Sequence, residues 1–339
     1  MNSLNYKPQR TGILQRIGIK HHEYWPWWML VAPIWPLWAW YMIRIGKLTW
    51  FTAVNPGMED SGFLGESKIK ILNSIPNEYK PITVFIPHQI NFDELNELLP
   101  FPCIAKPDIG GRGRKIKIIH SIEELELYHH EIGEDYMIQE IIPFELELGI
   151  FYVRMPYEKR GEIVSISEKE FLHVIGDGTS TVKELMQKNY RASLQIDRLE
   201  SIIDLNEILP LHEKKLLEPI GNHCRGTIFR DRGNLINDQL TKVMDEVCSK
   251  IDGFFYGRFD LRVKSIEDLM QGRHIQIMEL NGLTSDAAHI FDPNARLRDA
   301  IKTQLINCKK SYQIAKYNLK HGAKTTPIAE LYRKSKNGF

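Results

Sequence analysis

The chain of 339 residues lacks paired cysteines and lacks a dominant charge. Its four cysteines (Cys103, Cys224, Cys248 and Cys308) form no CxxC pair and lie in no Cys/His cluster with zinc spacing. We therefore expect reduced thiols in a cytosolic protein. The 44 Lys and Arg nearly balance the 43 Asp and Glu, and the net charge of +1 gives no long-range field. No nucleic-acid partner is implied.

The common phosphate-binding fingerprints are also absent. Neither GxxxxGK[ST] nor GxGxxG occurs, which excludes a Walker-type or Rossmann-type nucleotide site. No convincing Ser/His/Asp or Cys/His set suggests a covalent nucleophile.

Tryptophan is missing after Trp50, because all seven tryptophans lie between Trp25 and Trp50. The twenty residues from Tyr24 to Ile43 carry no charge and reach the length that spans a bilayer. Three prolines disfavour a straight helix, and Trp and Tyr prefer the headgroup region. Three interpretations stay open: a segment lying in the membrane surface (24–43), an element buried in the fold or in a homodimer, and a spanning helix.

The rest of the pattern predicts an α+β protein of two or three packed units. Strands are expected at 48–54, 82–86, 103–107, 115–120, 136–142, 147–155, 161–172, 254–263 and 274–281. Helices are expected at 66–74, 91–99, 121–132, 181–189 and onward to about Lys215, 237–251 and 295–322. A mobile polar tail is expected from Lys324.

Two neighbouring strands carry the most informative polar residues. The segments GRFDLRV and IQIMELNG place Asp260 on one strand and Glu279 and Asn281 on the next. Glu279 and Asn281 are two residues apart and face the same side. Two carboxylates and an amide oxygen suit Mg²⁺, and an unpaired carboxylate among apolar neighbours would be costly. The alternative is a solvated charged edge.

The segment AKPDIGGRGRKI is a second candidate site. Lys106 ends a strand, and the loop after it contains Gly110, Gly111, Arg112 and Gly113. Glycine lets backbone amides approach a phosphate, and the lysine can pair with its charge. A glycine-rich loop alone is weak evidence. In MIQEIIPFELEL, backbone groups after a strand could bind an adenine edge and a later carboxylate could bind ribose, although surface glutamates are the simpler interpretation.

Together and in this order, these segments resemble the ATP-grasp superfamily, most closely its D-alanine–D-alanine ligase and cyanophycin synthetase branch. The resemblance implies two lobes that clasp ATP between antiparallel sheets. It implies cofactors ATP and Mg²⁺ (two ions, with Mn²⁺ as a substitute). The resemblance implies that the nucleotide phosphates contact Lys68, Lys106, Gly110, Gly111, Arg112 and Gly113, and that the terminal phosphate contacts Lys169. It implies that adenine contacts Glu140, Ile141 and Ile142, and that ribose contacts Glu147. It also implies that Arg258 stabilises the transition state and that Asp260, Glu279 and Asn281 bind magnesium.

The resemblance covers about residues 66–310. We expect a Trp-rich segment with a reduced preceding region (1–65), a small lobe (66–145), a large lobe with the metal site (146–323) and a polar tail (324–339). The ligases usually have a substrate-binding α/β domain before the small lobe. Here that region holds only one expected strand and the Trp-rich segment, so the substrate cannot be carried over.

The function implied by the resemblance is an ADP-forming carboxylate–amine ligase. A carboxylate, small or linked to a lipid or polymer, is activated as an acyl phosphate, and an amine then displaces phosphate. The alternatives are an ATP-grasp phosphotransferase without ligase activity and a membrane-associated ATP-binding partner protein. The expected location is cytoplasmic, with peripheral attachment to the inner face of the membrane if residues 24–43 contact lipid.

Overall fold

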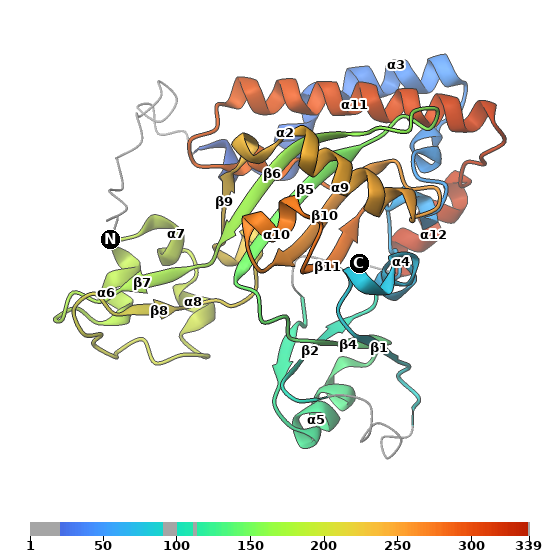
Figure 1. Ribbon diagram of the computed structural model, residues 1–339. Coiled ribbons are helices and arrows are strands. Elements are labelled where there is room, and N and C mark those ends of the chain that lie inside the picture. The colour runs from blue at the N-terminus through green and yellow to red at the C-terminus, as the bar shows by residue number, and fades with distance from the viewer. Residues whose placement is uncertain (1–20, 91–99, 111–113, 338–339) are drawn as a thin grey trace.

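The computed structural model describes residues 21–90, 100–110 and 114–337. Figure 1 shows a large sheet backed by helices, with two smaller bodies attached below it. One smaller body is a four-stranded sheet with a helix, and the other is a two-stranded sheet among short helices. The expected α+β class, with antiparallel sheets, is confirmed.

The large sheet has the strand order β11-β10-β5-β6-β9, and all its neighbours are antiparallel. The strands are β5 (Leu146–Val153), β6 (Glu162–Glu170), β9 (Ile228–Asp231), β10 (Tyr256–Val263) and β11 (Ile275–Asn281). Because side chains alternate along a strand, Tyr152 and Phe259 face one side, and Phe151 and Tyr256 face the other. Each side belongs to a separate hydrophobic core.

Three helices cover the first side. They are α4 (Lys68–Ser74), α9 (Asp238–Ser249) and α10 (Ile266–Met270). Leu72 of α4 and Met244 of α9 are almost fully buried in the same core as Phe259. Asn237 caps α9 by accepting the Leu240 N–H, close to the predicted helix start.

The smaller four-stranded sheet has the order β1-β4-β2-β3. Its strands are β1 (Thr83–Ile86), β2 (Cys103–Pro107), β3 (Lys117–Ile119) and β4 (Tyr136–Glu140). Helix α5 (Ile122–Ile132) packs on it through Leu125 and Tyr128. Ser121 caps this helix, because its side chain accepts the Glu124 N–H. The helix predicted at 91–99 lies outside the described residues.

A third unit inserts between β6 and β9. It contains β7 (His173–Ile175), α6 (Val182–Gln187), α7 (Tyr190–Ser193), α8 (Ile196–Leu199) and β8 (Lys214–Leu216) around its own core. The 3₁₀ turns in the described part of the chain are His22–Tyr24, Ala32–Ile34, Trp50–Ala53, Glu59–Ser61, Asn77–Tyr79, His223–Arg225, Gly233–Leu235 and Ala288–Phe291.

The Trp-rich segment and the long closing helix form what we call the aromatic layer. It comprises α2 (Trp27–Val31), α3 (Trp35–Ile45), the turn Trp50–Ala53 and α11 (Leu297–Lys320), and Figure 1 shows α3 alongside α11. The rings of Tyr41 and Tyr312 stack at 3.8 Å, and those of Trp38 and Phe51 at 4.9 Å. Phe151 and Tyr256 of the large sheet join the same core. The layer therefore covers part of the second side of the sheet.

The strand predicted at 48–54 is wrong. Residues Trp50–Ala53 form a 3₁₀ turn in which all four side chains are buried. A half-buried strand would alternate between buried and exposed positions. The β-branched and aromatic composition thus reflects burial in a core.

The mobile tail predicted from Lys324 is also wrong. Residues Ile328–Asn337 form helix α12, and Leu331 is buried in the aromatic layer core. Lys334 Nζ contacts Asp60 Oδ2 at 2.7 Å and Glu59 Oε1 at 2.8 Å. One buried leucine and these ion pairs hold a helix whose other large apolar side chains, Ile328 and Tyr332, are exposed.

Among the helices that the structure describes, none combines the length and the apolar character needed to cross a membrane.

Candidate functional site

A cavity of about 560 Å³ lies between the large sheet and the smaller four-stranded sheet. Most of the predicted site residues line it: Lys68, Lys106, Gly110, Glu140, Ile142, Glu147, Lys169, Arg258, Asp260, Glu279 and Asn281. Ile141 is not among the lining residues and is 36% exposed. Gly111, Arg112 and Gly113 lie outside the described residues.

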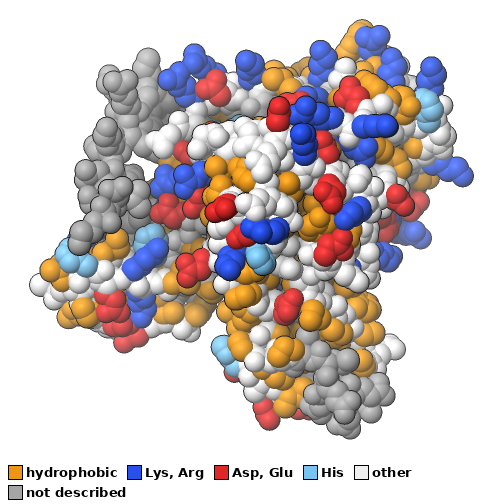
Figure 2. Space-filling model, viewed as in Figure 1, with side chains coloured by type: hydrophobic (Ala, Val, Ile, Leu, Met, Phe, Trp, Pro, Cys, Tyr) orange, Lys and Arg blue, Asp and Glu red, His pale blue; other side chains and the backbone are white. Residues whose placement is uncertain are grey.

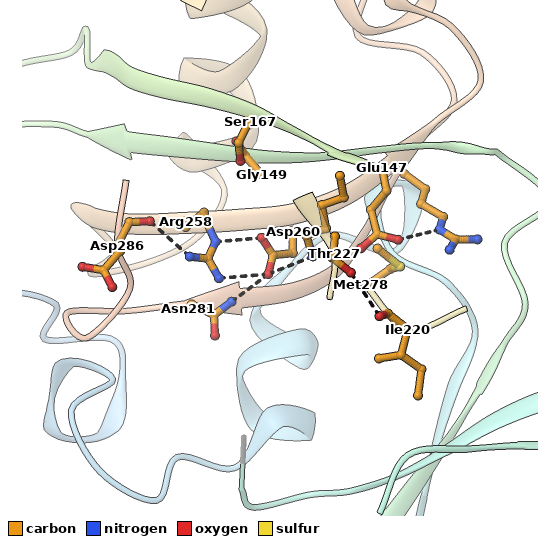
Figure 3. Close-up of polar contacts among 12 residues, drawn as sticks. Glu147, Gly149, Ser167, Ile220, Thr227, Arg258, Asp260, Met278, Asn281 and Asp286 are labelled. Carbon is orange, nitrogen blue, oxygen red and sulfur yellow. Dashed lines mark hydrogen bonds and ion pairs between the residues drawn. The ribbon is translucent and has the colours of Figure 1, made fainter. Parts of the chain in front are cut away.

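Strand β10 places three charged side chains on one face. Arg258, Asp260 and Arg262 alternate along it, and Asp260 lies opposite Glu279 of β11. Arg258 donates from Nε to Asp260 Oδ1 at 2.8 Å and from Nη2 to Oδ2 at 3.2 Å, as Figure 3 shows. Asp260 is 5% exposed, so this two-pronged pair lies out of solvent.

A second ion pair joins β5 and β6 to these residues, and we call Glu147, Lys169, Arg258, Asp260 and Arg262 the charged row. Lys169 Nζ lies 2.8 Å from Glu147 Oε1 and 3.6 Å from Asp260 Oδ2. Arg262 donates from Nε to Glu147 Oε2 at 2.9 Å. The buried site thus alternates positive and negative groups, which is how buried charges are tolerated.

These contacts set the protonation of the row. Burial alone would lower the pKa of Lys169, but the Asp260 and Glu147 carboxylates hold it above its usual value. Burial alone would raise the pKa of Asp260, but Arg258 and Lys169 hold it below its usual value. Both groups are therefore charged at neutral pH.

Two glycines give this row its space. A Cβ atom on Gly149, which lies opposite Asp260, would come within 2.8 Å of Ser167 Oγ and 3.3 Å of Asp260 Oδ1. Figure 3 shows Gly149 and Ser167 on neighbouring strands beside this pair. A Cβ atom on Gly221 would come within 2.7 Å of Glu147 Oε1. Any larger residue at either glycine would push into the charged row.

Lys106 reaches the cavity from the smaller sheet. Its Nζ donates to Gln139 Oε1 at 3.1 Å and, across the cavity, to the Met278 carbonyl oxygen at 3.3 Å. The β10–β11 register shifts at Met278, since Glu279 pairs with Asp260 while Ile277 pairs with Leu261. A residue at such a bulge is left out of the ladder, so the Met278 carbonyl is available to the lysine.

The two predicted phosphate lysines differ in environment. Burial lowers the pKa of Lys106 to about 8, although the Glu279 charge opposes this. Lys68 Nζ donates to the carbonyl oxygens of Asp108, at 3.2 Å, and Gly110. Both ammonium groups therefore rest on backbone or amide oxygens, which an anionic ligand could replace.

The predicted metal ligands line the same part of the cavity. Asn281 donates from Nδ2 to Asp260 Oδ2 at 3.3 Å (Figure 3). A metal between these two groups would require the amide to turn its oxygen inward. Among the described residues, no three His, Cys, Asp or Glu side chains form a metal-binding group. The predicted set contains only two carboxylates and an amide.

Glu66 provides the test of whether a cation fits here. Its Oε2 atom is buried and has no hydrogen-bond partner within the described part of the chain. Burial, and then the charge of Glu279, raises the pKa of Glu66 to about 7. Negative charge at this end of the cavity is therefore undercompensated, and the residues fit a divalent cation.

Sequence reasoning missed several polar residues that line the cavity, among them Glu66, Arg262 and Asp286. Burial raises the pKa of Asp286, and its Oδ1 accepts from Gln304 Nε2 of α11 at 2.8 Å. Its carbonyl oxygen accepts from Arg258 Nη1 at 3.1 Å (Figure 3). Strand alternation could have identified Arg262, which lies four residues after Arg258 on the same strand. Proximity in the sequence could have identified Glu66, which lies two residues before Lys68.

Comparison with known proteins gives one curated relative. No protein-family model matches the chain. The chain is 25% identical over 223 residues to cyanophycin synthetase of Synechocystis sp. (strain ATCC 27184 / PCC 6803 / Kazusa). The aligned region covers 59% of this chain and 25% of that protein. The chain thus spans about a quarter of the length of this relative.

Solved structures similar to the chain include D-alanine–D-alanine ligase from Bacillus anthracis, with 16% identity, a TM-score of 0.42, and coverage of 75% of this chain and 67% of that one. Another is a bifunctional glutathione synthetase from Pasteurella multocida, with 14% identity, a TM-score of 0.38, and coverage of 70% and 36%. The similarity to cyanophycin synthetase that the sequence predicted is found again in this comparison.

Proposed function

We propose that the chain is an ATP-grasp carboxylate–amine ligase that binds Mg-ATP in the cavity between its two larger sheets. It activates a carboxylate as an acyl phosphate and joins it to an amine, with release of ADP and phosphate. The smaller four-stranded sheet belongs to one lobe (66–145), and the large sheet to the other (146–323).

One observation supports this proposal above the others. Four cationic side chains, Lys68 from helix α4 and Lys106, Lys169 and Arg258 from the two sheets, line one cavity together with Asp260 and Glu279. These residues come from five segments that are far apart in the sequence. A cavity with cations on several sides and carboxylates at one end is complementary to a triphosphate with a bound metal ion.

The nucleotide is placed by the two lysines near the smaller sheet and by the chain after β4. Lys68 and Lys106 exchange their carbonyl and amide partners for phosphate oxygens. The backbone from Glu140 to Ile142 contacts the adenine edge, and Glu147 contacts the ribose. Gly110 lines the cavity, and the resemblance assigns it, with Gly111, Arg112 and Gly113, a role in binding the phosphates.

Asp260, Glu279 and Asn281 would hold magnesium, with Glu66 beside them. A metal ion held by these residues would neutralise charge on the phosphates and polarise the phosphorus that is attacked. Two Mg²⁺ ions, or Mn²⁺ in their place, are the expected complement. A bound cation would compensate the undercompensated charge of Glu66 and Glu279.

The reaction has two steps. A carboxylate oxygen of the substrate attacks the γ-phosphorus, the bond from that phosphorus to the bridging oxygen breaks, and ADP leaves. The amine nitrogen then attacks the carbonyl carbon of the acyl phosphate, the carbon–oxygen bond breaks, and phosphate leaves. Lys169 stabilises charge on the transferred group, and Arg258 stabilises the oxyanion. The amine releases one proton to water or a nearby carboxylate.

Binding and turnover test the proposal together. We measure the ATP dissociation constant by calorimetry with and without Mg²⁺, and ADP release with pools of carboxylates and amines. In the Asp260→Asn/Glu279→Gln double variant, we expect Mg-dependent turnover to fall by about 10²–10³-fold, since buried charge complementary to the transition state is lost.

The matched control is Asp238→Asn/Glu246→Gln, two exposed carboxylates on α9. This variant should match the original protein within twofold. The proposal fails if the purified protein shows no Mg-dependent ATP binding. Hydroxylamine should trap the acyl phosphate as a hydroxamate, and ATP consumption without a hydroxamate would instead identify a phosphotransferase acting on another group.

A further inference from the structure

Helix α3 is apolar on two opposite sides, and only one of them is buried. Tyr41 packs into the aromatic layer with 8% of its surface exposed. On the outer side, Trp35 is 54% exposed, Trp40 53% and Ile43 69%. A helix that is apolar all round is normally buried all round. The outer side of α3 is therefore a candidate contact surface.

The candidate surface extends beyond α3. Trp28 of α2 is 50% exposed and Leu48, after α3, is 54% exposed. We call Trp28, Trp35, Trp40, Ile43 and Leu48 the outer apolar patch. Tryptophan is the residue that prefers the boundary between headgroups and hydrocarbon in membranes.

The two chain segments that form most of this face carry charge of one sign. Residues 24–58 and 300–329 together contain eight Lys or Arg and no Asp or Glu, although the two signs are nearly balanced over the whole chain. Arg44, Lys47, Lys302, Lys309 and Lys316 are exposed. Figure 2 shows Lys and Arg side chains along the edge of the molecule that carries α3 and α11. The aromatic layer is thus a cationic face on a molecule that is negative elsewhere.

We propose that this face docks on an anionic lipid surface. Helix α3 lies in the plane of the interface, the outer apolar patch enters the headgroup region, and the lysines of α11 face the anionic headgroups. A basic amphipathic surface with Trp on its apolar side has the composition of monotopic membrane helices. Each Lys or Arg near an anionic leaflet adds to the attraction.

A second copy of the chain is the competing occupant, and charge argues against it. A symmetric contact through this face would bring two identical cationic layers together. Like charges across an interface are repulsive and select against a partner. An anionic lipid surface instead complements the cations and accepts the exposed tryptophans.

The location of the tryptophans makes a direct test available. All seven lie between Trp25 and Trp50, so intrinsic tryptophan fluorescence reports on this segment alone. We mix the full chain with vesicles of phosphatidylcholine, alone or with 30% phosphatidylglycerol, and measure flotation and quenching by brominated acyl chains. We expect co-flotation and quenching with the anionic vesicles, and at least tenfold weaker binding in 0.5 M NaCl.

Variants separate the patch from the general surface. Trp35→Gln/Trp40→Gln should weaken vesicle binding at least tenfold, and Lys302→Glu/Lys309→Glu/Lys316→Glu should do the same. The matched controls are Ile202→Gln/Leu211→Gln, with two side chains 63% exposed in the third unit, and Lys242→Glu/Lys264→Glu, with exposed lysines elsewhere. Both controls should bind as the original protein does.

Three outcomes overturn the proposal. One is a full chain that does not float with anionic vesicles, and another is equal binding to neutral and anionic vesicles. The third is a concentration-dependent dimer in analytical ultracentrifugation that the Trp35→Gln/Trp40→Gln variant loses, without vesicle binding. That result would assign the patch to a second copy. ATP binding measured on the same samples keeps this result separate from the proposed ligase activity.

Discussion

The two ends of strand β10 differ sharply although they share one face of one sheet. At its start, Tyr256 packs edge-to-face on Phe151, with ring centroids 5.0 Å apart, in the core of the aromatic layer. Two and four residues later, Arg258 and Asp260 form a buried ion pair in the cavity. Burial of apolar rings at one end stabilises the folded state, whereas the other end contains charged groups whose burial is costly.

The comparison teaches how the candidate site is supported. Ion pairs inside a protein rarely stabilise the fold relative to apolar packing, so the rigidity that positions Arg258 and Asp260 must come from elsewhere on the sheet. The aromatic layer lies on the same face and contacts the site directly, through Gln304 of α11 on Asp286. Stability and chemistry should therefore be separable by substitutions at the two ends.

The largest expected effect is on stability at the aromatic end. Trp50 is 1% exposed, and its ring lies 5.5 Å from that of Trp38 and 6.1 Å from those of Tyr41 and Tyr312. Trp50→Ala should lower the free energy of unfolding by about 3–5 kcal/mol, because it opens a cavity in a packed core. Urea denaturation measures this change.

Trp40→Ala serves as the control on the same layer, since Trp40 is half exposed, and it should cost less than about 1 kcal/mol. ATP affinity of folded Trp50→Ala should stay within about threefold of the original. A large loss of affinity in that variant would show that the two ends are not separable.

The next prediction is an increase in the free energy of unfolding, from a substitution at the cavity. Burial lowers the pKa of Lys106 to about 8 from a usual value of 10.5. Below pH 8 the lysine is charged in both states, and folding carries the cost of burying that charge. Lys106→Met should therefore raise the free energy of unfolding at pH 7 by about 1–3 kcal/mol, while it weakens ATP binding.

The sign can be checked by raising the pH. Between pH 8 and 10.5 the folded lysine loses its proton while the unfolded one keeps it, so the original protein gains stability as pH rises. The advantage of Lys106→Met should shrink over that window. If the difference in the free energy of unfolding between Lys106→Met and the original protein stays constant up to pH 10.5, burial does not lower the pKa of Lys106. Lys70→Met, at an exposed lysine of α4, is the control and should show no such pH dependence.

The smallest effect concerns helix α12 at the edge of the aromatic layer. Lys334 is paired with Glu59 and Asp60, and its side chain is 22% exposed. Lys334→Met should lower the free energy of unfolding by about 1 kcal/mol, because a partly exposed ion-pair network contributes modestly. Lys336→Met, two residues later, should change it by less than about 0.5 kcal/mol. Equal effects in thermal denaturation would show that the ion pairs do not hold the helix.

Much of the site could be predicted from sequence because strand periodicity fixes which side chains share a face. Glu279 and Asn281, two residues apart, do line the same cavity as Asp260. Lys106 was predictable as a lysine at a strand end. Its bond to the Met278 carbonyl was not, since it depends on a register shift between β10 and β11 that leaves no sequence signal.

The failures also have physical causes. The turn Trp50–Ala53 has the composition of a strand, but a fully buried turn needs the same residues. Helix α12 was missed because Leu331 is its one buried hydrophobic residue and because Lys334 pairs with Glu59 and Asp60, which lie far away in the sequence. Glu66 was missed because its burial comes from tertiary packing around Gly62 and Gly282, far apart in the chain.

The aromatic layer joins two segments that are made at very different times. Residues 24–54 leave the ribosome long before α11 (Leu297–Lys320), which supplies Tyr312 and the other half of their core. At about 5–20 residues per second, roughly 250 intervening residues take on the order of 10–50 s to translate. During that interval, the most apolar stretch of the nascent chain has no native partner helix. A chaperone or a lipid surface that shields it would then act first on biogenesis, before any catalytic role.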